Sequence, residues 1–226
     1  MANSPTLELA QRMADLSRSV AAPRDIDHVL DGVTSAAVDL LAAADTAGVL
    51  LVAKGGKFES LAGTSELIYE LDRLQQKHGT GPCIDAAVNE LVVRTDDFKT
   101  EKRWAPYSQA VWKMGVRSSL SFKLYTGDRT AGALNVFSKE AGGFDADSEV
   151  IGSVLAAHAA AAILASREAE QLKSALLSRD LIGQAKGILM ERYQVDAVGA
   201  FEMLRKLSQQ MNVALTDVAQ RVVDTR

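Results

Sequence analysis

The sequence predicts an α+β fold, in which an antiparallel sheet is flanked by helices and followed by one long helix and two short ones. Three observations predict this class. Apolar residues recur at helical spacing in several segments, and apolar runs that suit strands are paired around glycine-containing turns. In addition, the 47 residues from Asp147 to Tyr193 contain no proline and no cluster of turn-forming residues.

The first two thirds of the chain alternate between helical and strand-like segments. A short amphipathic helix is expected at 5–19, and Asp25 suits the N-cap of a second helix, whose apolar positions continue to Leu41. Asp145 is expected to cap the long helix, which ends near Gln194. The remaining helices are expected at 65–77, 84–89 and 104–114, and the strands at 46–53, 58–62, 91–95, 118–125 and 131–137, with turns at Gly55-Gly56 and Gly127-Asp128.

Composition bounds the number of domains and the kinds of partner. A chain of 226 residues with 47% hydrophobic content can bury the core of one large or two small domains. The net charge is −4, but residues 165–226 carry 9 Lys and Arg against 8 Asp and Glu, which leaves 16 against 21 for the rest. The C-terminal part is therefore relatively basic, although it has no polybasic tail that would by itself predict nucleic-acid binding.

Several motifs are absent, and each absence narrows the function. A single cysteine, Cys83, excludes an intrachain disulfide and a CxxC metal site, and the three histidines fall on separate elements without ligand spacing. One axial histidine would suffice for haem, but packed or surface histidines are the expectation, so we assign no metal site and the sequence identifies no cofactor. The N-terminus lacks the features of a signal peptide, and the most apolar tract, Val154–Ala165, is too short to span a bilayer. We therefore expect a cytoplasmic protein that binds no membrane.

The C-terminal segment Ser174–Val223 places polar and basic residues at fixed offsets on the end of the long helix and on the two short helices. These residues, with the apolar ones between them, are Arg179, Ile182, Gln184, Ala185, Lys186, Gly187, Ile188, Leu189, Met190, Arg192, Ala200, Phe201, Leu204, Arg205, Ser208, Asn212, Asp217, Val218 and Ala219. In this order the segment resembles the ANTAR module, the RNA-binding output domain of bacterial transcription antitermination regulators. The resemblance implies a dimer that holds paired stem-loops of a leader transcript and prevents a terminator hairpin from forming.

The resemblance implies RNA contacts for Lys186 and Gln184, and also for Arg179, Arg192 and Arg205. Recognition of a looped RNA requires cations at phosphates and polar groups at exposed base edges, which these side chains supply. Arg179 and Lys186 are seven residues apart and lie on nearly the same helix face, which Gln184 flanks. The alternative is that the cations are solvated or paired surface residues, as Glu202 and Lys206 would be at i,i+4 spacing. The apolar residues expected to form the core of the unit are Ile182, Ile188, Leu189, Phe201, Leu204, Leu207, Leu215 and Val218.

Residues 25–165 carry a second ordered set of residues. They are Gly81, Pro82, Cys83, Asp85, Ala86, Val92, Thr95, Asp97, Arg103, Trp104, Gly115, Val116, Arg117, Ser118, Gly132, Ala133, Leu134, Asn135, Val136 and Phe144. With the predicted elements, this set resembles a GAF domain, a bacterial sensor fold for small molecules or redox signals. The resemblance implies a small-molecule ligand near Cys83, Asp97, Arg103, Trp104 and Arg117. Alternatively, the charged members form a structural cluster of ion pairs.

Cys83 is the single thiol and therefore the candidate for covalent chemistry. It follows Gly81-Pro82 at an expected helix start, where the helix dipole would favour a thiolate. Some GAF-like proteins are sulfoxide-reducing enzymes, but those need an attacking and a resolving thiol, and this chain has one. A buried, inert cysteine is the default for a lone thiol. We therefore expect no enzymatic activity and no catalytic residues.

The long helix predicts a dimer. At 1.5 Å per residue it is about 70 Å long, which exceeds the size of a small domain. Its small and apolar residues recur at alternating three- and four-residue steps, the spacing of a coiled-coil-type seam. The seam residues are Ile151, Leu155, His158, Ala162, Ala165, Ala169, Leu172, Leu176, Arg179, Gly183 and Met190. The alternative is a helix that packs only on its own domain.

These observations predict three regions and one function. The regions are an N-terminal extension at 1–24, a GAF-like sensor at 25–165 and an ANTAR-like RNA-binding unit at 166–226. The predicted function is that of a signal-responsive homodimer that binds stem-loop RNA in leader transcripts and prevents transcription termination under the control of its sensor. The alternative is a sensor and protein-interaction module without nucleic-acid binding, which would contact its partner through the face of Gly183 and Gly187.

Overall fold

The computed structural model describes residues 11, 14, 26–52, 58–88, 90–126 and 129–225. Apart from residues 11 and 14, the helix expected at 5–19 lies outside the described residues, as do Asp25 and the turns at Gly55-Gly56 and Gly127-Asp128. The chain divides into two compact units, residues 1–165 and residues 166–226.

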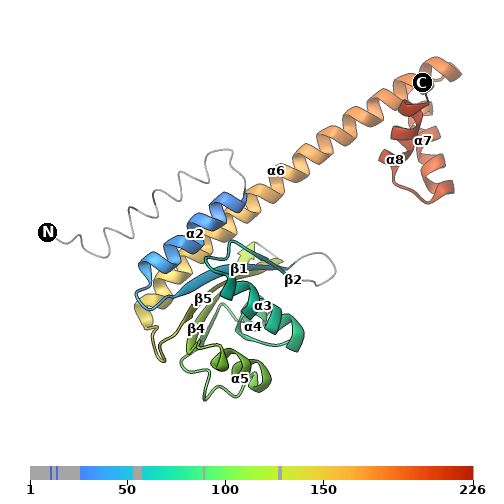
Figure 1. Cartoon of the computed structure of the whole chain (residues 1–226). Helices are drawn as coiled ribbons and strands as arrows, with labels where there is room; N and C mark the ends of the chain where they lie inside the picture. Colours follow the sequence, from blue (N-terminus) through green and yellow to red (C-terminus); the bar gives the residue numbers. More distant parts are fainter. Residues whose placement is uncertain are drawn as a thin grey trace. The chain divides into compact units, whose positions relative to one another are not determined.

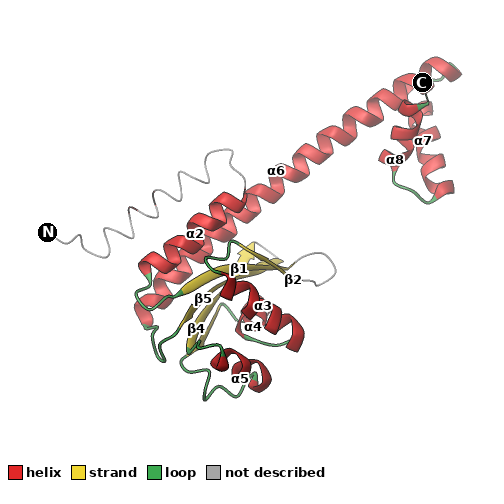
Figure 2. Ribbon diagram, viewed as in Figure 1, coloured by secondary structure: helices red, strands yellow, loops and turns green. Residues whose placement is uncertain are grey.

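The first unit is built on a five-stranded antiparallel sheet with the strand order β2-β1-β5-β4-β3 (Figure 2). Its strands are β1 (Thr46–Val52), β2 (Phe58–Leu61), β3 (Val92–Thr95), β4 (Ser118–Thr126) and β5 (Arg129–Ser138). Strands that follow each other in the chain pair as β1 with β2, β3 with β4 and β4 with β5. Strand β5 also pairs with β1, where Leu134 lies opposite Val49. The predicted α+β class is therefore confirmed.

Helices cover both faces of this sheet (Figure 1). The first face packs against α2 (Ile26–Leu40) and the first part of α6 (Ala146–Tyr193), in a core that includes Leu30, Leu134 and Leu155. The opposite face packs against α3 (Glu66–His78), α4 (Pro82–Val88) and α5 (Ala105–Lys113). Cys83, Trp104, Tyr107 and Phe137 belong to this second core.

Two glycines allow the close approaches on which this packing depends. A Cβ atom on Gly132 of β5 would collide with the backbone of Leu50, so the absence of a side chain permits the pairing of β5 with β1. A Cβ atom on Gly152 would likewise enter the ring of Phe122, so this glycine lets α6 lie close to β4. The predicted cap of α6 is confirmed, because the Asp145 carboxylate accepts a hydrogen bond from the Ser148 amide at 2.9 Å.

The long helix α6 departs from the predicted dimer seam over its first part. Leu155 and Ala162 are buried within the chain itself, because this face of α6 packs on the sheet and on α2. The predicted dimer seam is therefore wrong for the part of α6 before Ala165. Its positions from Ala165 to Leu176 are exposed. By length and composition alone, an 18-residue window of α6 could cross a membrane, but a core helix of a soluble protein passes the same test, and 39% of this window is buried in the fold.

The second unit consists of the end of α6 with α7 (Ala197–Met211) and α8 (Leu215–Asp224). Its core residues are Ala185, Leu189, Ala200, Leu204, Val218 and Ala219. Asp196 caps α7 by accepting a hydrogen bond from the Gly199 amide at 2.7 Å, and Asn212 ends it in the left-handed conformation. Three residues expected in the core do not belong to it: Phe201 and Leu207 each keep 37% of their surface exposed, and Ile188 is only partly buried.

Candidate nucleic-acid interface and sensor interior

The predicted RNA-binding residues all have access to solvent on the second unit. Arg179, Gln184, Arg192 and Arg205 are exposed, and Lys186 is half-buried. None of them belongs to the core of the unit. Their long polar side chains can therefore reach a partner without unfolding the unit.

Arg179 and Lys186 both line one groove between α6 and α7. The groove has a volume of about 580 Å³ and is lined by Ala175, Ser178, Arg179, Ile182, Gly183, Lys186 and Phe201. The α6 residues form two adjacent rows with spacings of three and four residues, so they lie on a single face of that helix. Phe201 closes the groove from α7. Of the described residues that line it, two are cationic and none is acidic.

The other predicted RNA contacts lie outside this groove. Gln184 and Arg192 are on α6 but do not line it, and Arg205 is on α7. The guanidinium of Arg205 pairs with the carboxylate of Glu202 at 2.6 Å. The expected partner of Glu202 was Lys206, so the pair is shifted by one residue. Glu202 partly neutralises the charge of Arg205. Arg179 and Lys186 have no acidic residue in their groove, so they are better placed to attract a phosphate.

In the sensor unit, Cys83 is fully buried and held by Gln75. The amide of Gln75 donates to the Cys83 sulfur at 2.7 Å, and the Cys83 backbone amide donates to Oε1 of Gln75 at 3.0 Å. Ser121 on β4 donates to the same sulfur at 3.8 Å. Burial, with a smaller contribution from the charge of Asp72, raises the pKa of the Cys83 thiol well above its ordinary value. The side chain therefore remains a thiol, the form that is a poor nucleophile.

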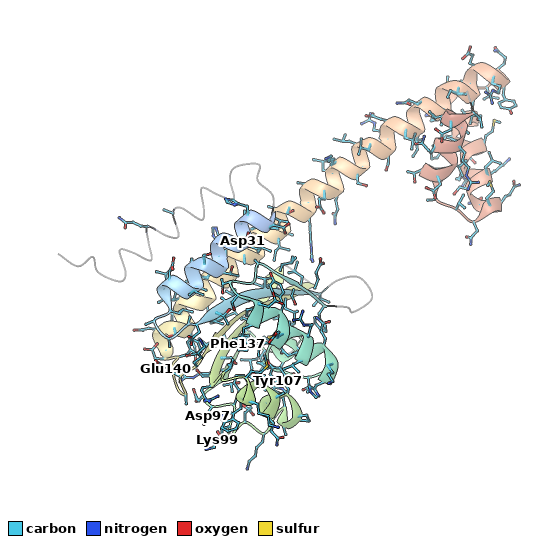
Figure 3. The ribbon with its side chains drawn as sticks, in the orientation of Figure 1. Asp31, Asp97, Lys99, Tyr107, Phe137 and Glu140 are labelled. Atoms are coloured by element: carbon cyan, nitrogen blue, oxygen red, sulfur yellow. The ribbon has the colours of Figure 1, made fainter. Side chains whose placement is uncertain are left out.

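Further polar side chains lie on the same face of the sheet as Ser121. Ser121 lies opposite Asn135 in the pairing of β4 with β5, and Ser119 is two residues before Ser121, so all three side chains point to the side of α3, α4 and α5. Tyr107 of α5 is also inside, in edge contact with Phe98, which in turn stacks on Phe137 (Tyr107 and Phe137 are labelled in Figure 3). Within the described part of the chain, the side-chain polar atoms of Ser119, Asn135 and Tyr107 have no hydrogen-bond partner. The sensor interior thus holds hydrogen-bonding capacity that its own residues do not use.

The five predicted ligand residues are divided between this interior and the surface. Cys83 and Trp104 are buried in the same core, and the indole of Trp104 donates to the Asp85 carboxylate at 2.8 Å. Arg103 stacks on Trp104 with its guanidinium 4.4 Å from the ring centroid, and it pairs with Glu101 at 2.7 Å. These contacts fix the position of Trp104.

Asp97 and Arg117 take part in surface contacts. Asp97 lies at the outer edge of the unit beside Lys99 (Figure 3), whose backbone amide donates to its carboxylate at 2.9 Å. The Arg117 guanidinium donates to the carbonyl of Trp112 at 2.9 Å and lies 5.2 Å from the centroid of that ring. A ligand-binding role for the five residues stays a prediction. In the described residues, no three His, Cys, Asp or Glu side chains gather as a metal site.

The sequence analysis did not identify Asp72 and Gln75 as interior residues, although their spacing on α3 indicates it. Ile68, Leu71, Asp72 and Gln75 recur at three- and four-residue steps and are all buried on one face of α3. Asp72 and Gln75 therefore occupy core positions of an amphipathic helix, although polar residues of a helix are usually assigned to its solvent face. A polar residue in register with a buried apolar stripe is the signal that identifies them.

Comparison with known protein families and solved structures supports both units. Residues 23–164 match the model of the GAF domain, and residues 170–223 match the model of the ANTAR domain. Among curated proteins, no sequence matches this chain significantly.

Solved structures share the fold at low sequence identity. The GAF domain of a phosphoenolpyruvate-protein phosphotransferase from Coxiella burnetii is 17% identical, with a TM-score of 0.58 over 74% of this chain and 99% of that chain. A free methionine-R-sulfoxide reductase from Neisseria meningitidis is 16% identical, with a TM-score of 0.55 over 75% of this chain and 96% of that chain. The photosensory core module of a Stigmatella aurantiaca phytochrome is 12% identical, with a TM-score of 0.60 over 92% of this chain and 46% of that chain. At these identities the likeness concerns the fold alone.

The two family matches agree with the two structural units. A GAF domain implies a sensor, and an ANTAR domain implies an RNA-binding antitermination regulator, so both are regulatory rather than catalytic domains. The chain therefore belongs to the GAF domain family and, with its C-terminal ANTAR domain, is a GAF and ANTAR domain-containing regulator.

Proposed function

We propose that this protein is a cytoplasmic homodimer that binds stem-loops of leader transcripts through its ANTAR domain and thereby prevents a terminator hairpin from forming. A signal received by the GAF domain controls this binding. The observation that carries the proposal is the groove of the ANTAR unit, in which Arg179 and Lys186 stand on one face of α6 without an acidic neighbour among the lining residues. Such a surface suits phosphates, whose contacts position a nucleic acid on a protein.

Control by the sensor requires that its ligand bind two states of the protein with different affinities. The unused hydrogen-bonding groups of Ser119, Asn135 and Tyr107 support a polar ligand or solvent in the sensor interior. We assign no reductase role to Cys83. Its buried side chain stays in the thiol form, and the sequence contains no second cysteine to act as the resolving thiol. The similarity in fold to a methionine-R-sulfoxide reductase therefore does not imply the same activity for this chain.

The proposal predicts a specific effect of a single cation. Lys186→Ala should weaken the binding of a leader RNA about tenfold or more, because a charged hydrogen bond to a phosphate is lost. The slope of log K against log salt concentration should also decrease by about one. Both quantities follow from fluorescence-polarisation titrations of the full chain at several salt concentrations.

The matched control is Lys173→Ala. Lys173 is an exposed lysine of the same helix, but it lies in a different groove, beside α8. If Lys173→Ala and Lys186→Ala reduce affinity and salt slope equally, the binding is unspecific attraction to a charged helix, and the assignment of the groove is wrong.

The RNA itself should be identified by crosslinking in cells. The intact protein is crosslinked, purified under denaturing conditions, and the retained RNA is sequenced. Stem-loops upstream of terminators would support the proposal. Recovery of a stoichiometric protein without RNA would instead support a sensor and protein-interaction module, in which the open face of Gly183 and Gly187 contacts that partner.

A further inference from the structure

We propose that the groove between α6 and α7 is a base-binding subsite, in which Phe201 stacks on an unpaired base of an RNA loop while Arg179 and Lys186 hold the flanking phosphates. This proposal rests on the RNA-binding function proposed above. It adds the residue that receives a base and thereby explains how the unit would distinguish a loop from a paired stem, whose bases are not accessible for stacking.

Phe201 is an aromatic side chain that the fold does not need as a core residue. It keeps 37% of its surface exposed, whereas its neighbours Ala200 and Leu204 on α7 are fully buried in the core of the unit. Its ring instead forms a wall of the groove, together with Ile182 of α6. Exposed aromatic surface is unfavourable in water, so a partner that covers the ring would recover this free energy.

Gly183 gives the groove its depth on the α6 side. A Cβ atom at this position would meet nothing within 4 Å, so no packing in the described chain requires a glycine here. Glycine in the middle of a helix nevertheless costs about 1 kcal/mol relative to alanine. A flat ring that approaches the α6 backbone opposite Phe201 would use the space that a side chain would fill.

The chemistry of the groove favours a nucleotide over other occupants. Its volume of about 580 Å³ falls within the range of small-molecule pockets, about 300–1,000 Å³, and it combines an aromatic wall with two cations. An aromatic ring stacks on any base, and the two cations on the α6 side of the groove can neutralise phosphates next to that base. A helix from a protein partner would instead be matched by a longer apolar surface without two adjacent cations.

The test uses the full-length protein and a defined probe. Hairpins with a fixed stem and a randomised loop are selected for binding to the natural protein, and loop bases of the selected hairpin are replaced one at a time by 2-aminopurine. Stacking on Phe201 should quench the fluorescence of one loop position. Phe201→Leu should abolish this quenching and weaken binding about 5- to 150-fold, and Phe201→Trp should restore both.

Two matched controls separate a binding role from a structural one. Tyr193→Leu removes another exposed aromatic ring of the unit, 54% exposed and outside the groove, and should leave quenching and affinity unchanged. Gly183→Ala should raise or preserve thermal stability and yet weaken hairpin binding, whereas Gly187→Ala, equally open but outside the groove, should give the same stability with little loss of binding.

Each contrary result has one meaning. If Lys186→Ala weakens hairpin binding while Phe201→Leu behaves like Tyr193→Leu, the stacking proposal is overturned and the RNA-binding function stands. If no hairpin of the pool binds to the natural protein, both fail. If Phe201→Leu changes the sedimentation of the protein and not its affinity for the hairpin, the groove is a contact between two copies of this chain.

Discussion

At the scale of single residues, Asp72 shows how the sensor interior constrains the chemistry of a side chain. It lies on the buried face of α3, where the amide of Gln75 approaches its carboxylate at 3.5 Å. Burial raises the pKa of Asp72 from 3.8 to about 6, and a hydrogen bond from Ser60 lowers it by a smaller amount. The folded protein therefore binds a proton at this site more tightly than the unfolded chain does.

This raised pKa makes the stability of the sensor dependent on pH. The contribution of protonated Asp72 is fully present below about pH 4 and is lost as the pH rises through about 6, which amounts to about 3 kcal/mol at neutral pH. Asp72→Asn should therefore raise the unfolding free energy at pH 7 and flatten its decline between pH 4 and 7. Urea unfolding followed by tryptophan fluorescence measures this effect, because both tryptophans, Trp104 and Trp112, belong to the sensor.

Asp31→Asn is the control for this measurement. Asp31 is an exposed residue of α2 (Figure 3), and its replacement should leave the pH dependence as it is. A pH profile of Asp72→Asn that coincides with that of the natural protein would show that Asp72 does not carry the effect.

The location of a residue, at the surface or in the core, was predictable where the residue belongs to a sequence motif. It was not predictable from the polarity of the residue alone. Lys186 and Gln184 were expected at the surface, and neither is in the core. Phe201 was expected in the core, because an apolar residue at helical spacing is compatible with both a core and the wall of a groove. Asp72 was missed because a polar residue on an amphipathic helix is usually solvated. Only the packing of neighbouring elements decides such positions.

At the scale of elements, α6 carries two different surfaces along its 48 residues. Its first part contributes Leu155 and Ile163 to the core of the sensor, and its apolar residues between Glu168 and Leu177 are exposed to solvent. Leu172 and Leu176 are exposed by 64% and 52%, at the four-residue spacing of the predicted seam. The extent of the helix was predictable because its end signals are local, whereas the face it presents to the sheet depends on long-range packing.

The exposed part of α6 predicts a specific disruption of the proposed homodimer. Leu176→Glu places like charges opposite each other in a symmetric helical dimer, so it should raise the dimer dissociation constant about tenfold or more. Sedimentation velocity over a range of concentrations measures this shift. Leu177→Glu, at a leucine one residue further on that is exposed by 62%, should have little effect because it lies about 100° around the helix from the seam. Dissociation by Leu177→Glu alone would place the interface on another face of α6.

At the scale of the whole molecule, the chain contains separate hydrophobic cores of unequal size. The sensor has two extensive clusters, one on each face of its sheet, whereas the core of the ANTAR unit consists of a few residues from three helices. No buried cluster among the described residues includes members of both units. A defect in one core should therefore be felt mainly in its own unit.

Truncation of a core residue in each unit tests this independence. Leu204→Ala should destabilise the ANTAR unit by about 2–5 kcal/mol, because it leaves a cavity in a small core, and should leave amide protection in the sensor unchanged. Leu134→Ala, in the core of the sensor, should give the reverse pattern. Hydrogen exchange read out by peptide fragments distinguishes the two. Equal loss of protection in both units after either substitution would mean that the chain unfolds as one cooperative body.

The continuity of α6 also restricts how the length of this protein can change. Every side chain from Glu168 to Leu177 is exposed, so residues can be removed from this stretch without opening either core. Each residue removed, however, turns all that follows by about 100° about the helix axis. A deletion of seven residues nearly restores the original phase, whereas a deletion of five leaves the downstream helices rotated by more than a third of a full circle. Natural insertions and deletions in this stretch should therefore come in multiples that keep the phase of the helix.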